Sequence, residues 1–211
     1  MQQGNEGVDP YVMVEIGASS NPLLRSAALL SDVHRDLFRN QPNLQYFAVD
    51  IDEVELDRGQ KEIATLEQAG QLLPGQIRYV TVKEEDATLP FENNSVSEVI
   101  FKNTMGAGYI KIQKRQEMLH EAARILKPGG LLKIFEIYTP PAATKEGGPI
   151  EYIRKNMADV FEEPQVGDMD LTNHEFLDKM LLDKLSDYEK RFVLRFRKKT
   201  GMSQPKHHTG L

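Results

Sequence analysis

The sequence predicts an α/β domain in which a mostly parallel sheet carries helices on both faces. Strand-like apolar runs alternate with segments of helical periodicity from one end of the chain to the other. The first run, residues 11–16, is apolar almost throughout, as in a strand buried on both faces of a sheet. At 211 residues with 40% hydrophobic residues, the chain has the size of one domain with a two-sided core.

The first half of the chain predicts three strands and two helices. The opening strand ends at Gly17, where a glycine permits a tight turn. Apolar residues then recur at helical spacing, and Pro22 suits the first helical turn. In chain order we expect a strand at 11–16, a helix at 21–40, a strand at 44–50, a helix at 54–72 and a strand at 77–82.

The second half continues the alternation and then changes in texture. A strand at 96–101 precedes a helical face that stops at Lys127-Pro128-Gly129-Gly130, and a strand at 131–137 follows. The segment 139–170 is rich in Pro and Gly near its start and is interpreted as an insertion or lid, with an amphipathic piece near 150–161. A short helix at 174–180 and antiparallel strands at 181–187 and 191–198 complete a single domain of residues 1–200. A disordered tail is expected at 201–211.

Composition narrows the function classes. The net charge of −6 disfavours nonspecific binding to nucleic acid, and no window approaches the roughly 18 apolar residues of a membrane span. With no signal-peptide pattern and no cysteine, we expect a soluble, cytoplasmic protein without disulfides. The five histidines form no ligand pattern, so no metal site is expected. The basic run 190–199 is interpreted as the solvated face of an edge strand rather than a phosphate-binding stripe.

Candidate ligand-binding residues follow the predicted strands, where open α/β sheets bind their ligands. Gly17 is followed by a helix N-terminus whose free backbone N–H groups suit a carboxylate. Asp50 ends the second strand, where a carboxylate can bind both hydroxyls of a ribose, whereas Asp52 is expected to cap the next helix. Asp86 follows the third strand. Of the three glycines of the dinucleotide motif only Gly17 is present, which disfavours a nicotinamide oxidoreductase.

Several ordered segments resemble class I S-adenosylmethionine-dependent methyltransferases, especially the branch that methylates quinones and other small molecules. The resemblance covers about residues 11–138. It rests on Glu15-Ile16-Gly17, Asp50, Asp86-Ala87 with Leu89-Pro90-Phe91, and the run EAARILKPGGLL at 121–132. The resemblance implies a Rossmann-like sheet of seven mostly parallel strands with an antiparallel C-terminal strand pair. It also implies S-adenosyl-L-methionine as cofactor.

The resemblance further implies a set of cofactor-binding residues. The loop at Gly17 would contact the methionine part, Asp50 the ribose, Ile51 an adenine face and Asp86 the adenine amino group. The full set is Glu15, Gly17, Ser19, Asp50, Ile51, Asp86, Ala87 and Asn103. Ser19 and Asn21 stand where the family prefers glycine, which alters the loop.

Methyl transfer from a sulfonium is an in-line displacement that depends on positioning, so a catalytic base is optional. Candidates for a base are Glu136, Tyr138 and His174. The acceptor is expected to be an oxygen, nitrogen or carbon atom of a small metabolite, and a homodimer is compatible with the sequence. Residues in the expected lid that could face a substrate, a partner subunit or the core are Tyr152, Ile153, Met157 and Phe161. The alternative function is a noncatalytic methyltransferase-like module that serves protein contacts.

Overall fold

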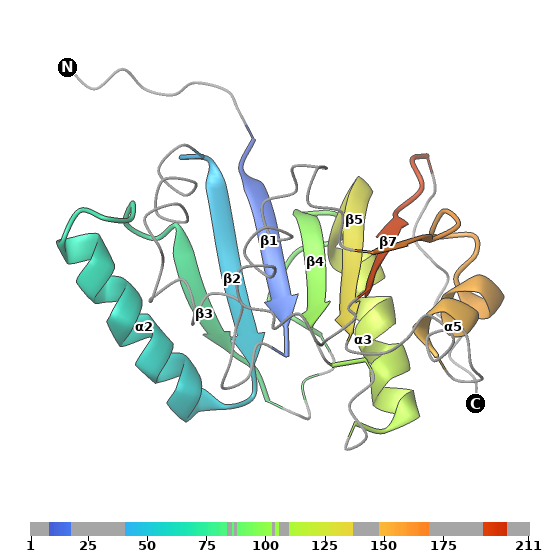
Figure 1. Cartoon of the computed structure of the whole chain (residues 1–211), viewed down its shortest axis with the longest axis horizontal. Coiled ribbons are helices and arrows are strands. Elements are labelled where there is room, and N and C mark those ends of the chain that lie inside the picture. The colour runs from blue at the N-terminus through green and yellow to red at the C-terminus, as the bar shows by residue number, and fades with distance from the viewer. Residues whose placement is uncertain are drawn as a thin grey trace. The chain divides into compact units, whose positions relative to one another are not determined.

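A computed structural model describes residues 9–17, 41–83, 86, 88–102, 104–105, 110–136, 148–168 and 192–201. The chain divides into two compact parts, residues 1–84 and residues 85–211, and each is described by itself. Figure 1 shows the elements of both parts. The helix expected at 21–40 and the strand expected at 181–187 lie outside the described residues.

Three parallel strands form the sheet of the first part (Figure 1). They are β1 (Tyr11–Ile16), β2 (Leu44–Asp50) and β3 (Ile77–Thr81), with β2 between the other two. Ile16 pairs with Val49, and Asp50 pairs with Thr81. Because the strands are parallel and almost in register, their carboxyl ends lie at one edge. Val14 and Ala48 are fully buried, which confirms the prediction that these apolar runs are inner strands.

Helix α2 (Glu53–Gln68) connects β2 to β3 and packs beside β3. It begins as predicted at Asp52, whose side chain accepts a hydrogen bond from the backbone N–H of Glu55 at 3.2 Å. Gly59 faces the ring of Tyr79, and a Cβ at this position would lie 2.5 Å from the ring. A glycine in mid-helix therefore lets the helix approach the sheet closely.

The second part contains four strands and two helices (Figure 1). In chain order they are β4 (Val96–Lys102), α3 (Ile112–Ile125), β5 (Leu126–Glu136), α5 (Pro149–Asn156), β6 (Gln165–Asp168) and β7 (Phe192–Arg197). β4 and β5 are parallel, whereas β7 runs antiparallel to both β5 and β6. The predicted α/β class with a mostly parallel sheet and an antiparallel C-terminal pair is confirmed. A single sheet of seven strands stays a prediction.

Two predicted boundaries in the second part are wrong. β6 is a strand within the segment 139–170 that was interpreted as an insertion, because the edge of β7 offers it backbone partners. β5 begins at Leu126, directly after α3, rather than at Leu131. The expected turn is a bulge in the strand: the register shifts after the Val96–Leu126 pair, and Gly129 adopts a φ of 80°.

Lys198, directly after β7, holds the end of α3. Its Nζ donates to the carbonyl oxygens of Ala123 and Leu126, each at 2.7 Å, and to Oδ1 of Asn94 at 2.8 Å. The last carbonyls of a helix have no intrahelical donor, and a cation there also interacts favourably with the helix dipole. Three acceptors match the three N–H donors of an ammonium group. Burial lowers the pKa of Lys198 below its usual value.

The interpretation of the basic run 190–199 as a solvated edge strand is therefore wrong. β7 lies between β5 and β6, and Leu194 and Phe196 are fully buried. Lys198 itself is only 9% exposed. The run reads as charged because its basic residues alternate with apolar ones, but at least one of its cations serves the interior.

We expect Lys198→Met to lower the free energy of unfolding by about 2–3 kcal/mol, because three acceptors would lose their donor. Urea denaturation followed by circular dichroism measures the change. The matched control is Lys199→Met, whose Nζ contacts the exposed carbonyl of Ala158, and it should cost less than about 0.5 kcal/mol. Equal effects of the two substitutions would contradict a capping role for Lys198.

Candidate functional site

The carboxyl-terminal edge of β1 and β2 brings Gly17 level with Asp50. The backbone N–H of Gly17 donates to the carbonyl oxygen of Val49 at 3.0 Å. Gly17 has a φ of 73°, which side chains rarely permit, so the chain turns away immediately after β1. The edge next to the Asp50 carboxylate is thus lined by backbone rather than by a side chain.

Asp50 has a defined orientation. Its Oδ1 accepts hydrogen bonds from the backbone N–H groups of Ile51 at 2.7 Å and Asp52 at 3.0 Å, and its own carbonyl oxygen accepts from Val82 at 2.9 Å. The residue is 8% exposed. Two backbone donors on one oxygen fix the plane of the carboxylate before any ligand arrives. An oriented carboxylate of this kind can accept hydrogen bonds from a pair of adjacent hydroxyls.

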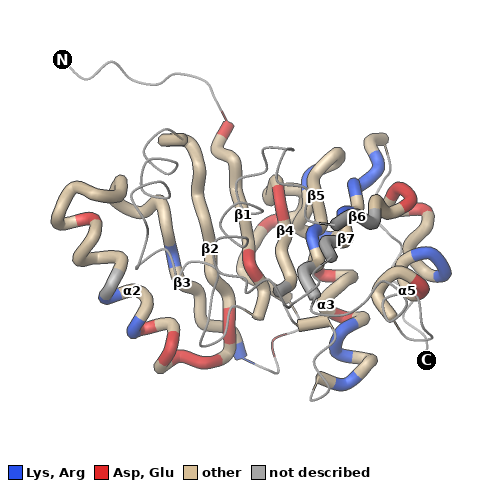
Figure 2. The backbone as a smooth tube through the Cα atoms, viewed as in Figure 1, with Lys and Arg blue, Asp and Glu red and all other residues tan. Residues whose placement is uncertain are grey.

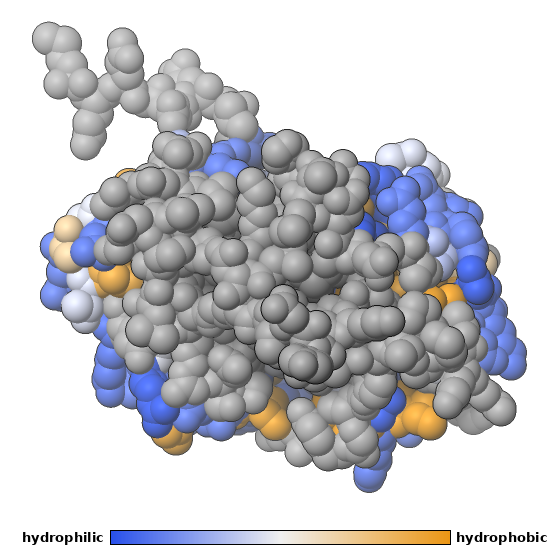
Figure 3. Space-filling view, viewed as in Figure 1, coloured by the Kyte–Doolittle hydropathy of each residue, from blue (hydrophilic) through white to orange (hydrophobic). Residues whose placement is uncertain are grey.

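An exposed apolar side chain stands directly beside this carboxylate. Ile51 is 59% exposed, and Val54, on the first turn of α2, is 71% exposed. On the face shown in Figure 3, the hydrophobic surface of the described residues occurs as small patches among hydrophilic ones. Single exposed apolar residues are common, but one next to an oriented carboxylate offers a surface for a flat aromatic ring.

The same corner is acidic. Asp50 and Asp52 are followed by Glu53 and Glu55 in the first turn of α2, and Figure 2 shows these positions in red where β2 runs into the helix. Carboxylates near a helix N-terminus interact favourably with its dipole. Their combined negative potential attracts a cationic ligand and repels phosphate groups.

Glu15 lies in the core beneath this edge. It is 1% exposed and accepts a hydrogen bond from the hydroxyl of Tyr46, which is completely buried on the neighbouring strand β2. A buried carboxylate requires such donors to offset its lost hydration. Sequence reasoning selected Glu15 but missed Tyr46. The available signal was a pair of polar residues, one on each of two adjacent apolar strands.

Asp86, in the second part, is exposed. The loop that follows it is bound to α3, since the carboxylate of Glu121 accepts a hydrogen bond from the backbone N–H of Leu89 at 2.6 Å. The other predicted site residues have no described side chain. Ser19, Ala87, Asn103, Tyr138 and His174 lie outside the described residues, and of Glu136 only the backbone is described, as the last residue of β5. All of these assignments stay predictions.

The amphipathic piece of the expected lid packs into the core. Ile153, Met157 and Phe161 are buried, and the hydroxyl of Tyr152 lies 3.0 Å from Nε2 of His120 on α3. Burial raises the pKa of the Tyr152 hydroxyl. Of the three alternatives for these side chains, the structure places Ile153, Met157 and Phe161 in the interior.

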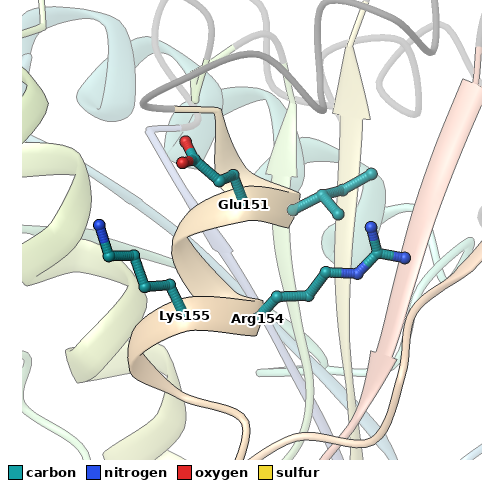
Figure 4. Close-up of a pocket in the computed structure, with 4 residues that line it drawn as sticks. Glu151, Arg154 and Lys155 are labelled. Atoms are coloured by element: carbon teal, nitrogen blue, oxygen red, sulfur yellow. The ribbon is translucent and has the colours of Figure 1, made fainter.

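A hollow of about 370 Å³ lies beside α5 and contains none of the predicted site residues. In Figure 4, Glu151, Arg154 and Lys155 project from successive positions of this helix, and Ile150 completes the lining. Arg154 forms an ion pair with Glu163. The described lining comes from one helix, so we assign no ligand to it. Within the described residues no cluster of His, Asp or Glu could hold a metal ion, and no helix has the length and apolar character to cross a membrane.

Comparison with known proteins identifies a family. A family model described as a methyltransferase domain matches residues 30–134. The chain is 30% identical over 114 residues to 2-methoxy-6-polyprenyl-1,4-benzoquinol methylase, mitochondrial, of Caenorhabditis elegans. The match covers 54% of this chain and 37% of that protein, so the chain spans little more than a third of the relative's length.

Solved structures share the fold at low sequence identity. Geranyl diphosphate C-methyltransferase from Streptomyces coelicolor A3(2), solved with S-adenosyl-L-homocysteine, aligns with a TM-score of 0.52 at 14% identity over 92% of this chain and 74% of that one. The [4+2]-cyclase SpnF aligns with a TM-score of 0.54 at 14% identity over 90% of this chain and 76% of that one. Similarity at this identity concerns the fold alone.

We expect Tyr46→Phe to lower the free energy of unfolding by about 2 kcal/mol, because the buried Glu15 carboxylate would lose a hydrogen-bond donor. Chemical denaturation measures the loss. Tyr11→Phe, at the exposed start of β1, is the control and should change stability by less than about 0.5 kcal/mol. A neutral Tyr46→Phe would mean that the hydroxyl does not stabilise Glu15.

Proposed function

We propose that this chain, which belongs to the class I S-adenosylmethionine-dependent methyltransferase family, binds S-adenosylmethionine and transfers its methyl group to a small metabolite. The observation that carries the proposal is the oriented Asp50 carboxylate, level with the Gly17 turn and beside the exposed Ile51. The acceptor would be an oxygen, nitrogen or carbon atom.

The chemistry of these residues fits the cofactor. Asp50 would accept hydrogen bonds from the two ribose hydroxyls, and Ile51 would cover one face of the adenine ring. The Gly17 turn would admit the methionine part close to the backbone, with Glu15 and Tyr46 supporting the strand beneath. The acidic corner favours a ligand that carries positive charge, and it disfavours the pyrophosphate of a nicotinamide dinucleotide.

When bound, the cofactor would supply an electrophilic methyl group on a sulfonium. The chain's own contribution is then to hold a nucleophile in line with that methyl group, which can supply much of the acceleration. A base is optional for an acceptor that is already nucleophilic. Glu136, Tyr138 and His174 stay candidates for acceptors that must lose a proton.

A second function is a module that binds the cofactor or a protein without transferring a methyl group. The altered loop with Ser19 and Asn21 favours it, and so does the fold shared with a [4+2]-cyclase. A cytoplasmic location and a homodimer also belong to this proposal. The C. elegans relative is named as mitochondrial.

We expect Ile51→Ala to weaken the binding of S-adenosylhomocysteine about tenfold, because the adenine face would lose an apolar contact worth about 1–1.5 kcal/mol. Isothermal titration calorimetry measures the affinity. Ile51 is exposed in the unliganded chain, so its truncation should leave the melting temperature unchanged. Val54→Ala, a similar truncation of a more exposed side chain one helical turn away, is the control and should bind as the wild type does.

Titration with NAD and an activity screen separate the alternatives. Binding of S-adenosylhomocysteine without turnover of any acceptor would favour the noncatalytic module. No binding of S-adenosylhomocysteine or S-adenosylmethionine by the intact chain would overturn the proposal, and binding of NAD in their place would indicate an oxidoreductase.

A further inference from the structure

Two charged residues on α3 hold the loop that follows Asp86. Glu121 and Arg124 lie one helical turn apart and form an ion pair, with side chains 12% and 20% exposed respectively. Nε of Arg124 donates to Oε2 of Glu121 at 2.8 Å, and this contact raises the pKa of Arg124. We call Glu121 and Arg124 the α3 clamp.

The clamp binds both backbone groups of one loop residue. Glu121 Oε1 accepts from the N–H of Leu89 at 2.6 Å, and Nη2 of Arg124 donates to the carbonyl oxygen of Leu89 at 3.1 Å. A strand in a sheet would satisfy a backbone in the same way, with one donor and one acceptor. Here side chains do so, and because both are charged the hydrogen bonds are stronger than neutral ones.

The far end of the loop is bound to the same helix. Nη1 of Arg124 donates to Oδ1 of Asn93 at 2.7 Å, and the backbone carbonyl oxygen of Arg124 accepts from the N–H of Asn94 at 3.0 Å. Between these anchors, the N–H of Phe91 closes a tight turn onto Leu89 at 2.8 Å. The segment 89–94 therefore follows one defined path across α3.

Stability alone does not account for this arrangement. An ion pair with an i,i+3 spacing near a helix surface typically contributes less than about 1 kcal/mol. Lys114 and Glu117 form such a pair on the same helix, with side chains 39% and 54% exposed. The clamp differs because its hydrogen bonds reach residues 31 to 35 positions away. It fixes a loop rather than a helix.

We propose that Glu121 and Arg124 are positioning residues that fix where the Asp86 carboxylate stands, and thereby set the selectivity of the site for the 6-amino group of adenine. Asp86 is exposed and lies three residues before the clamped Leu89, so its position depends on where that residue is held. The inference rests on the proposed function, because it takes Asp86 as the acceptor for the adenine amino group.

The test compares S-adenosylhomocysteine with S-inosylhomocysteine, in which an oxo group replaces the 6-amino group. The wild type should prefer the adenosyl compound about tenfold, which is the usual order for one hydrogen bond to a charged group. Calorimetry gives the ratio of the two dissociation constants. Asp86→Ala should abolish the preference, and Glu121→Ala should reduce it to the same level although it leaves Asp86 in place.

Three variants sharpen the comparison. Glu121→Gln keeps an oxygen acceptor for the N–H of Leu89 but loses the charge, and it should restore part of the preference. Glu117→Ala breaks the neighbouring ion pair on the same helix and should keep the full preference. In the double variant Asp86→Ala/Glu121→Ala, the preference should fall no further than in either single variant, because both act on one contact.

Each outcome decides the proposal. If Glu121→Ala binds both compounds more weakly but keeps their ratio, the clamp is structural and the positioning role is overturned. If Glu121→Ala does not fold, Glu121→Gln and Arg124→Lys carry the same test, and an unchanged ratio in both overturns the role. If the wild type binds neither compound, the proposed function fails and this inference fails with it. Binding without any preference in the wild type overturns the role of Asp86 alone.

Discussion

The parallel pairing of β1 with β2 is the constraint on which the candidate site depends. It places Ile16 opposite Val49, and the next hydrogen bond, from Gly17 to Val49, brings the glycine turn level with Asp50. A shift of one residue would move every side chain of a strand to the opposite face. The alignment is secured by the inner apolar residues Val14 and Ala48 and by the buried Tyr46–Glu15 hydrogen bond. The geometry of the ligand-binding edge is therefore a property of the core beneath it.

The second part depends in the same way on the carboxyl end of α3. Here the chain passes from helix to strand with no connecting residue, so the last helical carbonyls must find donors from elsewhere in the chain. Lys198 supplies them from beyond β7, and Arg124 uses the same end of the helix to hold the loop at 89–94. One helix terminus thus connects the closing strand of the fold with the loop that carries Asp86.

The features that the sequence predicts well are local. The strands at 11–16, 44–50, 77–82 and 96–101 were placed within about one residue, because their apolar runs report burial directly. The Asp52 cap and the turn at Asp50 involve neighbours one to three positions away. β6 was missed because Gln165–Asp168 has little strand propensity and forms a strand only through its pairing with β7. The burial of Lys198 and the clamp at Leu89 depend on partners more than 30 residues away, which no local pattern reports.

The contacts of Lys198 have a consequence for biosynthesis. The ammonium group that completes α3 is encoded 72 residues after Leu126 and 104 residues after Asn94. During translation the helix and its flanking strands leave the ribosome long before their cation does. The nascent second part must therefore wait with exposed or water-bound carbonyls until β7 has been made, whereas the first part contains all of its own strands and can fold earlier.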